Sequence, residues 1–167
     1  MIRFRTIDSP IGPLTLAGRD SVLTHLRMAG QTYEPSRADW SPDPEVFDDV
    51  VEQLVSYFAG ELTDFDISFD LTGSPFQRRV WQALLTIPYG QTRSYGEIAR
   101  HIGAPGSARA VGLASGRNPL AIVIPCHRVI GADGSLTGYG GGLDRKRRLL
   151  ELEKRRTSAE FAHRLPA

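Results

Sequence analysis

One cysteine and its neighbours are the residues best able to do chemistry in this 167-residue chain. Cys126 is followed directly by His127 and Arg128. A thiol reacts as its thiolate, which nearby cations favour, so the cysteine and histidine are a candidate nucleophile and base. In an extended segment neighbouring side chains point to opposite faces, so His127 would reach the thiol only through a turn or a bridging water. The alternative is a buried structural cysteine beside a surface histidine.

Glu153 is the residue that could orient such a histidine. It follows Leu149 by four residues in a helix predicted over residues 144–155, and therefore shares the face of an apolar stripe. A buried carboxylate needs a partner. A histidine partner would make Glu153 the third group of a nucleophile–base–orienter relay. A solvated glutamate near the end of the helix is the alternative.

Two short predicted helices carry residues suited to binding DNA. Ser94 and Glu97 have the spacing of a capping box, which starts a helix ending near Ile102, and a second helix is predicted over residues 107–115. Two short helices joined by a tight turn are typical of a helix-turn-helix, although an αα-hairpin with only a packing role has the same pattern. Tyr95 begins the first helix, where backbone N–H groups can bind a phosphate; a packed aromatic residue is the plainer interpretation.

Arg109 lies early on the second of these helices, with Gly112 and Gly116 on the same face. A glycine costs about 1 kcal/mol in a helix interior relative to alanine, so the two glycines indicate close approach by another surface. That surface could be DNA or a crossing helix.

The charge of the chain is divided between its two halves. Residues 1–72 contain 5 Arg and Lys against 13 Asp and Glu, a net charge of −8, whereas residues 73–167 contain 15 against 6, a net charge of +9. A basic half of this strength indicates an anionic partner. The apolar fraction of 41% is typical of a folded domain, and no apolar run approaches the ~20 residues of a membrane span. A lone cysteine and no signal-peptide pattern predict a cytoplasmic protein without disulfides.

The N-terminal half is predicted to be an α+β unit. Short apolar or alternating runs predict strands at residues 1–8, 14–17 and 22–27, with a turn at residues 9–13. Residues 31–43 are polar and contain proline, which favours a loop. Helical spacing of apolar residues predicts a helix from about Glu45 to Gly60, and alternation over residues 65–71 predicts a half-buried strand.

The basic half is predicted to be mainly helical. Ser74 and Gln77 form a first capping box and start a helix that ends before residues 88–90. A short apolar run leads to Cys126, and six glycines between residues 131 and 142 predict a loop or tight hairpin. After the last helix, residues 156–167 are expected to form a flexible tail.

Taken in order, these motifs resemble those of a known family. Residues 124–129, IPCHRV, resemble the active-site motif of the O6-alkylguanine-DNA alkyltransferases of the bacterial Ogt type, and the whole chain resembles mycobacterial members. The resemblance is dense over residues 74–153 and looser before them. The further matches are residues 76–81, 87–90, 94–95, 108–112, 118–119 and 139–143, with residues 9–12 and 58–60 in the N-terminal half.

The resemblance implies a fold and a reaction. A ribonuclease-H-like α/β domain over residues 1–72 would support a winged-helix, helix-turn-helix DNA-binding domain over residues 73–155, giving an α+β protein. The alkyl group on O6 of a damaged guanine, and on O4 of thymine, would move irreversibly to Cys126, so each molecule would act once and without a cofactor. The protein would bind double-stranded DNA through the minor groove, as a monomer that could bind cooperatively.

Individual roles follow from the resemblance as well. Cys126 would accept the alkyl group, His127 would take the thiol proton through a water, and Glu153 would hold the histidine. Asn118 would support the local turn. Tyr95 would help to rotate the nucleotide out of the duplex and would donate a proton to guanine, and Arg109 would fill the space that the base leaves in the stack. The remaining implied contacts are Ala108, Gly112, Ser115 and Arg128 at the DNA, and Ala121, Val129, Tyr139 and Gly140 around the base. Backbone carbonyls of Cys126 and Val129 would read the guanine amino group, and the N–H of Gly140 would approach O6.

Departures from the family pattern carry their own expectations. Some members hold zinc in the N-terminal part, but here no cysteine precedes Cys126, so no metal is expected. Ala121 and Gly140 replace larger residues of some relatives, which predicts tolerance of larger alkyl groups and weak sensitivity to benzylguanine. The arginines at positions 145, 147 and 148 are expected to form a solvated helix face rather than a DNA contact.

Three other functions would fit parts of the same pattern. A module that recognises alkylated DNA without repair would lack the acceptor cysteine, which is present here. A cysteine hydrolase would regenerate its thiol after each turnover. A transcriptional regulator would use the helix-turn-helix but would leave Cys126, His127 and Glu153 without a purpose.

Overall fold

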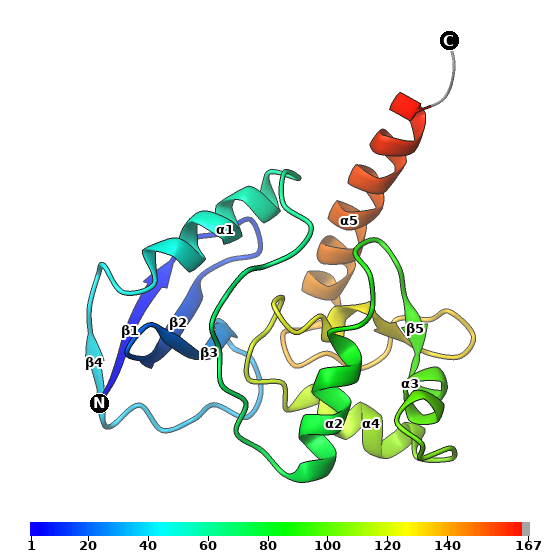
Figure 1. Cartoon of the computed structure of the whole chain (residues 1–167), viewed down its shortest axis with the longest axis horizontal. Helices are drawn as coiled ribbons and strands as arrows, with labels where there is room; N and C mark the ends of the chain where they lie inside the picture. The colour runs from blue at the N-terminus through cyan, green and yellow to red at the C-terminus, as the bar shows by residue number, and fades with distance from the viewer. Residues whose placement is uncertain (165–167) are drawn as a thin grey trace.

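A computed structural model describes the backbone of residues 1–164 and the side chains of residues 1–158. The N-terminal half is a four-stranded sheet of order β3-β2-β1-β4 with helix α1 lying across it (Figure 1). The elements of this half are β1 (Ile2–Ile7), β2 (Leu14–Arg19), β3 (Val22–Met28), β4 (Trp40–Pro42) and α1 (Asp48–Phe58). The antiparallel strands β1, β2 and β3 and helix α1 confirm the α+β unit predicted here.

Two predictions for this half were wrong in detail. Residues 40–42 are not loop: they form β4, parallel to β1, where the Trp40 ring packs against Phe4 and His25 at centroid distances of 5.9 and 5.1 Å. Residues 65–71 alternate in burial as predicted but make a single bridge to β3, at Leu23. The Gln53 side chain binds both the N–H and the C=O of Asp66, so this stretch is shared between the sheet and α1.

In the described part of the C-terminal half, four helices surround a small sheet (Figure 1). Both predicted capping boxes are present, at Ser74 and at Ser94. The two strands pair in parallel, which holds the start of α3 next to the segment that follows Cys126. The elements are α2 (Pro75–Leu84), β5 (Arg93–Ser94), α3 (Tyr95–His101), α4 (Ala108–Gly116), the 3-10 turn η1 (Cys126–Arg128), β6 (Val129–Ile130) and α5 (Leu143–Arg164).

The apolar run at residues 120–124 joins the two halves. It is buried throughout, and Leu26 of β3 exchanges backbone hydrogen bonds with Pro119 and Ala121 at 2.9 and 3.0 Å. Ile122 has φ +73°, a left-handed conformation that is uncommon for a β-branched residue. The run is therefore a bend, which turns the chain back toward the core immediately before Cys126.

Helix α5 differs from its prediction in length and in its arginines. It continues past residue 155 to Arg164, so residues 156–164 are helical rather than a flexible tail; residues 165–167 lie outside the described part. Arg145 donates to the carbonyls of Ala29 and Gly141, and Arg148 donates to that of Pro10. These two arginines thus connect α5 to the N-terminal half. The side chains of Arg147 and Arg148 are 55% and 56% exposed, as the predicted solvated face requires, whereas Arg145 is only half-exposed.

No helix among the described residues is long and apolar enough to cross a membrane.

The capping box of α3 is expected to contribute measurably to stability. Ser94→Ala removes the side-chain acceptor of the Glu97 N–H at 3.1 Å and should cost roughly 1 kcal/mol, or about 2–4 °C in Tm for a chain of this size. Ser107 precedes α4 but makes no capping hydrogen bond, so Ser107→Ala is the matched control. Equal thermal shifts for the two variants would contradict the capping argument.

Candidate active site

The turn η1 presents Cys126 to a shell of buried groups. Cys126 is 6% exposed, and its thiol accepts a hydrogen bond from Asn118 Nδ2 at 3.1 Å. The same amide donates to the Ile124 carbonyl at 2.7 Å, while Asn118 Oδ1 accepts from the Leu120 N–H at 2.9 Å. Asn118 therefore holds both ends of the bend before the cysteine, and its side chain reaches the reactive sulfur.

His127 and Glu153 form a buried pair next to this turn. Nε2 of His127 lies 2.7 Å from Oε2 of Glu153, and the two side chains are 0% and 1% exposed. An ionised carboxylate only accepts hydrogen bonds, which assigns the proton to Nε2 and leaves a lone pair on Nδ1. Burial lowers the pKa of His127 more than Glu153 raises it, so the ring is neutral near pH 7. Nδ1 is buried without a hydrogen-bond partner among the described residues.

Glu153 accepts hydrogen bonds from four residues in three segments of the chain. Arg128 Nε donates to it at 2.8 Å, the Tyr57 hydroxyl of α1 at 2.7 Å, and the Gly90 N–H at 3.3 Å, in addition to His127. Burial by itself would raise the pKa of Glu153, but the hydrogen bonds and charges of His127 and Arg128 outweigh it and hold that pKa well below its usual value. The carboxylate is therefore ionised at neutral pH.

The prediction that Arg128 contacts DNA is wrong, because its side chain lies in the interior of the protein. Its guanidinium is buried, donates to both oxygens of Glu153, and places its third bond on the Ile87 carbonyl at 2.7 Å. A buried arginine needs such partners, and Glu153 supplies the only ion pair that it makes among the described residues. The positive charge next to Cys126 in the sequence is thus used to hold the carboxylate.

Two further groups face the thiol. Burial raises the pKa of Cys126, and the Asn118 hydrogen bond, the charge of Lys146 and the Tyr139 hydroxyl each act to lower it. The Tyr139 hydroxyl is buried and makes no hydrogen bond of ordinary geometry with a described residue, yet it lies close enough that burial and the thiolate together raise its own pKa well above 10. The sequence did not identify Lys146 or Tyr57 as residues of the site. The charged run around Lys146 indicated only a solvated helix face, and the apolar spacing around Tyr57 indicated only a helix packed on the core.

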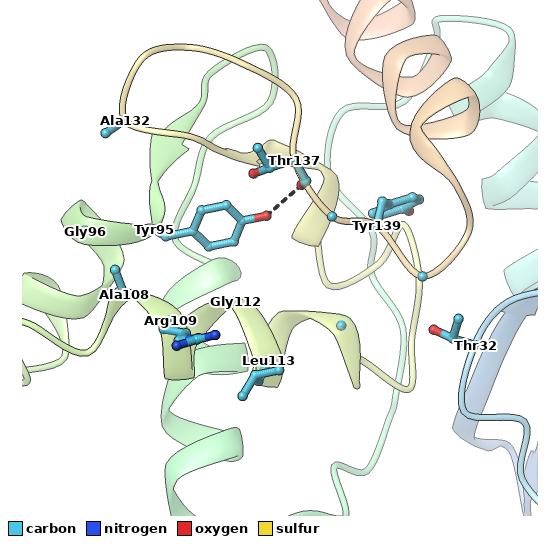
Figure 2. A pocket seen from close by; sticks show the side chains of 13 residues that line it. Thr32, Tyr95, Gly96, Ala108, Arg109, Gly112, Leu113, Ala132, Thr137 and Tyr139 are labelled. Carbon is cyan, nitrogen blue, oxygen red and sulfur yellow. Dashed lines mark hydrogen bonds between the residues drawn. The ribbon is translucent and has the colours of Figure 1, made fainter.

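A cavity of about 690 Å³ opens beside α4 and above this shell. Figure 2 shows Tyr95 on one wall, with its hydroxyl donating to the Thr137 carbonyl at 3.0 Å, and Arg109 and Leu113 projecting from α4. Thr32, from the N-terminal half, closes the opposite end. Leu113 was not singled out from the sequence, yet it is 65% exposed on the face that carries Arg109.

The glycines of α4 lie on the open side of this cavity. A Cβ at Gly116 would meet no described atom within 4 Å, and one at Gly112 would only touch the Tyr95 ring at 3.8 Å. No crossing helix therefore requires them. Of the two explanations that the sequence allowed, close approach by a partner outside the chain is the one that remains.

The other predicted site residues divide between the cavity and the interior. Ala108, expected at the DNA, and Tyr139 and Gly140, expected around the base, all line the cavity. Ser115 faces inward with a buried hydroxyl, so it cannot be a DNA contact, and Ala121 is buried against Leu26 rather than in the cavity wall. Val129 is buried, with its carbonyl accepting from Lys146 at 2.6 Å. No group of His, Cys, Asp and Glu suited to a metal occurs among the described residues.

Removing the charge of Glu153 should destabilise the fold. Glu153→Gln leaves the buried Arg128 without its counter-ion, which is expected to cost about 3–5 kcal/mol in urea unfolding at pH 7. The folded-state pKa is lowered, so this contribution is present above the unfolded pKa of about 4.3 and is lost as the pH falls through the folded value.

Glu151→Gln is the matched control, because Glu151 is exposed on the same helix. The Glu153→Gln variant should also show a flatter loss of stability on acidification below about pH 4. Similar unfolding curves for the two variants at pH 7 would contradict the assignment.

Two family models match the chain, one on each half. The model described as "6-O-methylguanine DNA methyltransferase, ribonuclease-like domain" matches residues 2–71, and the model described as "6-O-methylguanine DNA methyltransferase, DNA binding domain" matches residues 75–155. These matches confirm the resemblance and the fold class inferred from the sequence motifs.

Several known proteins are similar to this chain over most of its length. The methylated-DNA–protein-cysteine methyltransferase of Mycobacterium tuberculosis strain H37Rv is 72% identical over 161 residues, covering 96% of this chain and 98% of that protein. That of Methanosarcina acetivorans is 51% identical, covering 90% and 97%. The crystal structure of Mycobacterium tuberculosis OGT in complex with DNA has a TM-score of 0.91 at 73% identity, covering 92% of this chain and 94% of that one. By sequence, by fold and by both of its matched domains, the chain belongs to the 6-O-methylguanine DNA methyltransferase family.

Proposed function

We propose that this protein repairs O6-alkylguanine in duplex DNA by moving the alkyl group irreversibly to Sγ of Cys126. The observation that carries the proposal is the buried His127–Glu153 pair directly after a buried thiol in the chain, together with a cavity beside α4 whose lining includes Tyr139, a residue that interacts with that thiol. A hydrolase could use a similar relay. The helix-turn-helix beside the thiol and the match to a DNA-binding family model favour a DNA substrate.

The first step of the reaction is formation of the thiolate. Nδ1 of His127 carries the available lone pair, so it takes the thiol proton through one bridging water, since neighbouring side chains on η1 diverge. The ionised Glu153 stabilises the imidazolium that results. Asn118 donates to the sulfur and so favours the thiolate.

The second step is an in-line displacement on the alkyl carbon. A bond forms between Sγ and that carbon while the bond from the carbon to O6 breaks, and the electron pair stays with guanine. The alkyl carbon offers no carbonyl to polarise, so catalysis depends on positioning and on stabilising the departing base. Tyr95, at the cavity wall, gives its hydroxyl proton to the guanine ring. The thioether product does not hydrolyse, so each molecule reacts once.

The reacting carbon of a paired guanine is hidden in the duplex, so the nucleotide must rotate out of the stack. The cavity beside α4 is large enough for a base, and its open side carries Arg109 and the two helix glycines. With α4 in the minor groove, Arg109 fills the gap that the base leaves, as inserted side chains do in other minor-groove proteins. The same pocket would receive O4-alkylthymine.

Backbone groups around the cavity would read the base. The carbonyls of Cys126 and Val129 accept from the Val129 N–H and from Lys146, and each keeps a second lone pair for the guanine amino group. Gly140 lines the cavity and binds Thr32 through its carbonyl at 3.1 Å. The proposal of extra room for larger alkyl groups rests on Gly140 alone, and the ratio of benzyl to methyl transfer rates measures it.

Intact-mass spectrometry is the direct test of the reaction. Incubation with a duplex that carries one O6-methylguanine should add the mass of one methyl group to each protein molecule, located on Cys126 by peptide mapping. Cys126→Ala should bind the duplex and gain no mass. An unchanged wild-type mass with tight lesion binding would instead indicate recognition without repair.

Arg109→Ala should separate base rotation from chemistry. Because unstacking costs a few kcal/mol, loss of the inserted side chain should slow methyl transfer from duplex DNA by about tenfold or more. Transfer from a short single strand, whose base is already accessible, should change by less than about twofold. Arg78→Ala, an exposed arginine on α2 outside the cavity, is the charge control; equal losses on both substrates for Arg109→Ala would reject the assigned role.

A further inference from the structure

A second cavity, of about 240 Å³, adjoins the one that is proposed to receive the base. Thr32 and Gly116 line both cavities. The other walls of the second cavity come from both halves of the chain, and they include Arg27 and Tyr33 from the N-terminal half and Arg117 from the end of α4. The two cavities therefore meet between Thr32 and Gly116.

The side chain of Thr32 is the partition between the two cavities. Gly116 places no side chain there, and a Cβ at that position would meet no described atom within 4 Å. The Thr32 N–H donates to the Gly140 carbonyl at 3.1 Å, and the Thr32 carbonyl accepts from Arg27 Nη2 at 2.7 Å. Because the backbone of Thr32 is held from both sides, only its side chain is free to turn between the cavities.

The partition lies where the O6 substituent of a bound guanine would end. The proposed function places that substituent beside Gly140, and a Cβ built on Gly140 would meet Thr32 Oγ1 at 3.0 Å. Figure 2 shows Thr32 at the end of the cavity that lies away from Tyr95, the proposed proton donor to the guanine ring. A methyl group would end before Thr32, whereas a longer substituent would pass it and enter the second cavity.

The second cavity is basic. No acidic residue lines it among the described residues. Arg27 is 5% exposed, and its Nη1 makes no hydrogen bond with a described residue. Arg117 makes no ion pair with a described residue, and its guanidinium lies 3.9 Å from the centre of the Tyr33 ring. Glu34 lies 3.4 Å from Arg27 Nε but binds Arg37 more closely, at 2.6 Å.

This arrangement favours an anion with several acceptor atoms. A buried guanidinium with an unbound donor is stabilised by a negatively charged partner, and a carboxylate can accept two parallel hydrogen bonds from it. His25 also lines the cavity. Burial and the charges of Arg27 and Arg37 lower the pKa of His25, so its ring is neutral near pH 7 and adds a polar group rather than a third charge.

We propose that the second cavity binds the far end of long O6 substituents, that Arg27 and Arg117 select those ending in a carboxylate, and that Thr32 controls entry. This inference rests on the proposed function for the position of the substituent, and it adds a substrate class to that function. The bonds that form and break are those of methyl transfer, because only the part of the substituent beyond the reacting carbon differs.

The charge preference is tested with duplexes of one sequence that carry O6-(4-carboxybutyl)guanine or the neutral O6-(5-hydroxypentyl)guanine. Intact mass gives the single-turnover rate of transfer to Cys126. Wild type should transfer the carboxybutyl group faster, and Arg117→Gln should lower the ratio of the two rates by about tenfold, the effect of one hydrogen bond between charged groups. Arg78→Gln is the matched control and should keep the wild-type ratio, because Arg78 is exposed and lines neither cavity.

The role of Thr32 is tested with a neutral substituent, which separates size from charge. Thr32→Leu extends the partition and should lower the rate of hydroxypentyl transfer relative to methyl transfer by about tenfold or more. Thr32→Ser keeps a short side chain and should retain the wild-type ratio. Equal ratios for the leucine and serine variants would show that the substituent does not pass Thr32 and would overturn the inference.

Binding measurements keep this inference separate from the proposed function. Cys126→Ala cannot accept an alkyl group, and fluorescence anisotropy should show that it binds the carboxybutyl duplex more tightly than the hydroxypentyl duplex. Adding Arg117→Gln should remove that preference. If wild type transfers no group but the Arg117-dependent preference is present, the proposed function fails and the carboxylate site stands. A transfer ratio and a binding preference that Arg117→Gln leaves unchanged would overturn the inference, even where methyl transfer is normal.

Discussion

The buried carboxylate of Glu153 is the group on which the arrangement of this site depends. Its two oxygens accept hydrogen bonds from helix α1, from the loop that follows α2, and from two residues of η1. A charge removed from water is tolerated only when its lone pairs are satisfied, so these segments can adopt only positions that bring their donors together. The orientation of His127 beside Cys126 is one result of that requirement.

This requirement explains how the acidic N-terminal half contributes to a site made by the basic half. Tyr57 reaches Glu153 across the contact between the halves, and Leu26 binds the backbone of the bend that precedes the cysteine. Thr32 and Ala29 in turn hold the glycine-rich loop, through Gly140 and Arg145. The N-terminal half thus acts as a support that fixes the bend, the carboxylate and the loop, while the exposed residues of α4 remain outside it.

The separation of a buried nucleophile from an exposed binding face has a physical reason. A thiolate is protected from other electrophiles when it lies beneath Tyr139 and the glycine-rich loop, but burial also disfavours the charged form that must react. Asn118, His127 and Lys146 are the polar groups that oppose this penalty. Arg109 and Leu113, by contrast, line the cavity beside α4, and Leu113 is 65% exposed.

Local patterns in the sequence determined the helices with capping boxes and the three antiparallel strands, and they marked Cys126, His127 and Glu153 as candidates for chemistry. These depend on neighbours a few residues apart and on residue types that few other roles require. Only the tertiary structure decided that Arg128 faces Glu153 instead of DNA, that Tyr57 and Lys146 belong to the site, and that residues 65–71 are shared between sheet and helix. The partners of these groups lie far away in the chain, and whether a charge is solvated or paired depends on burial, which no local spacing encodes.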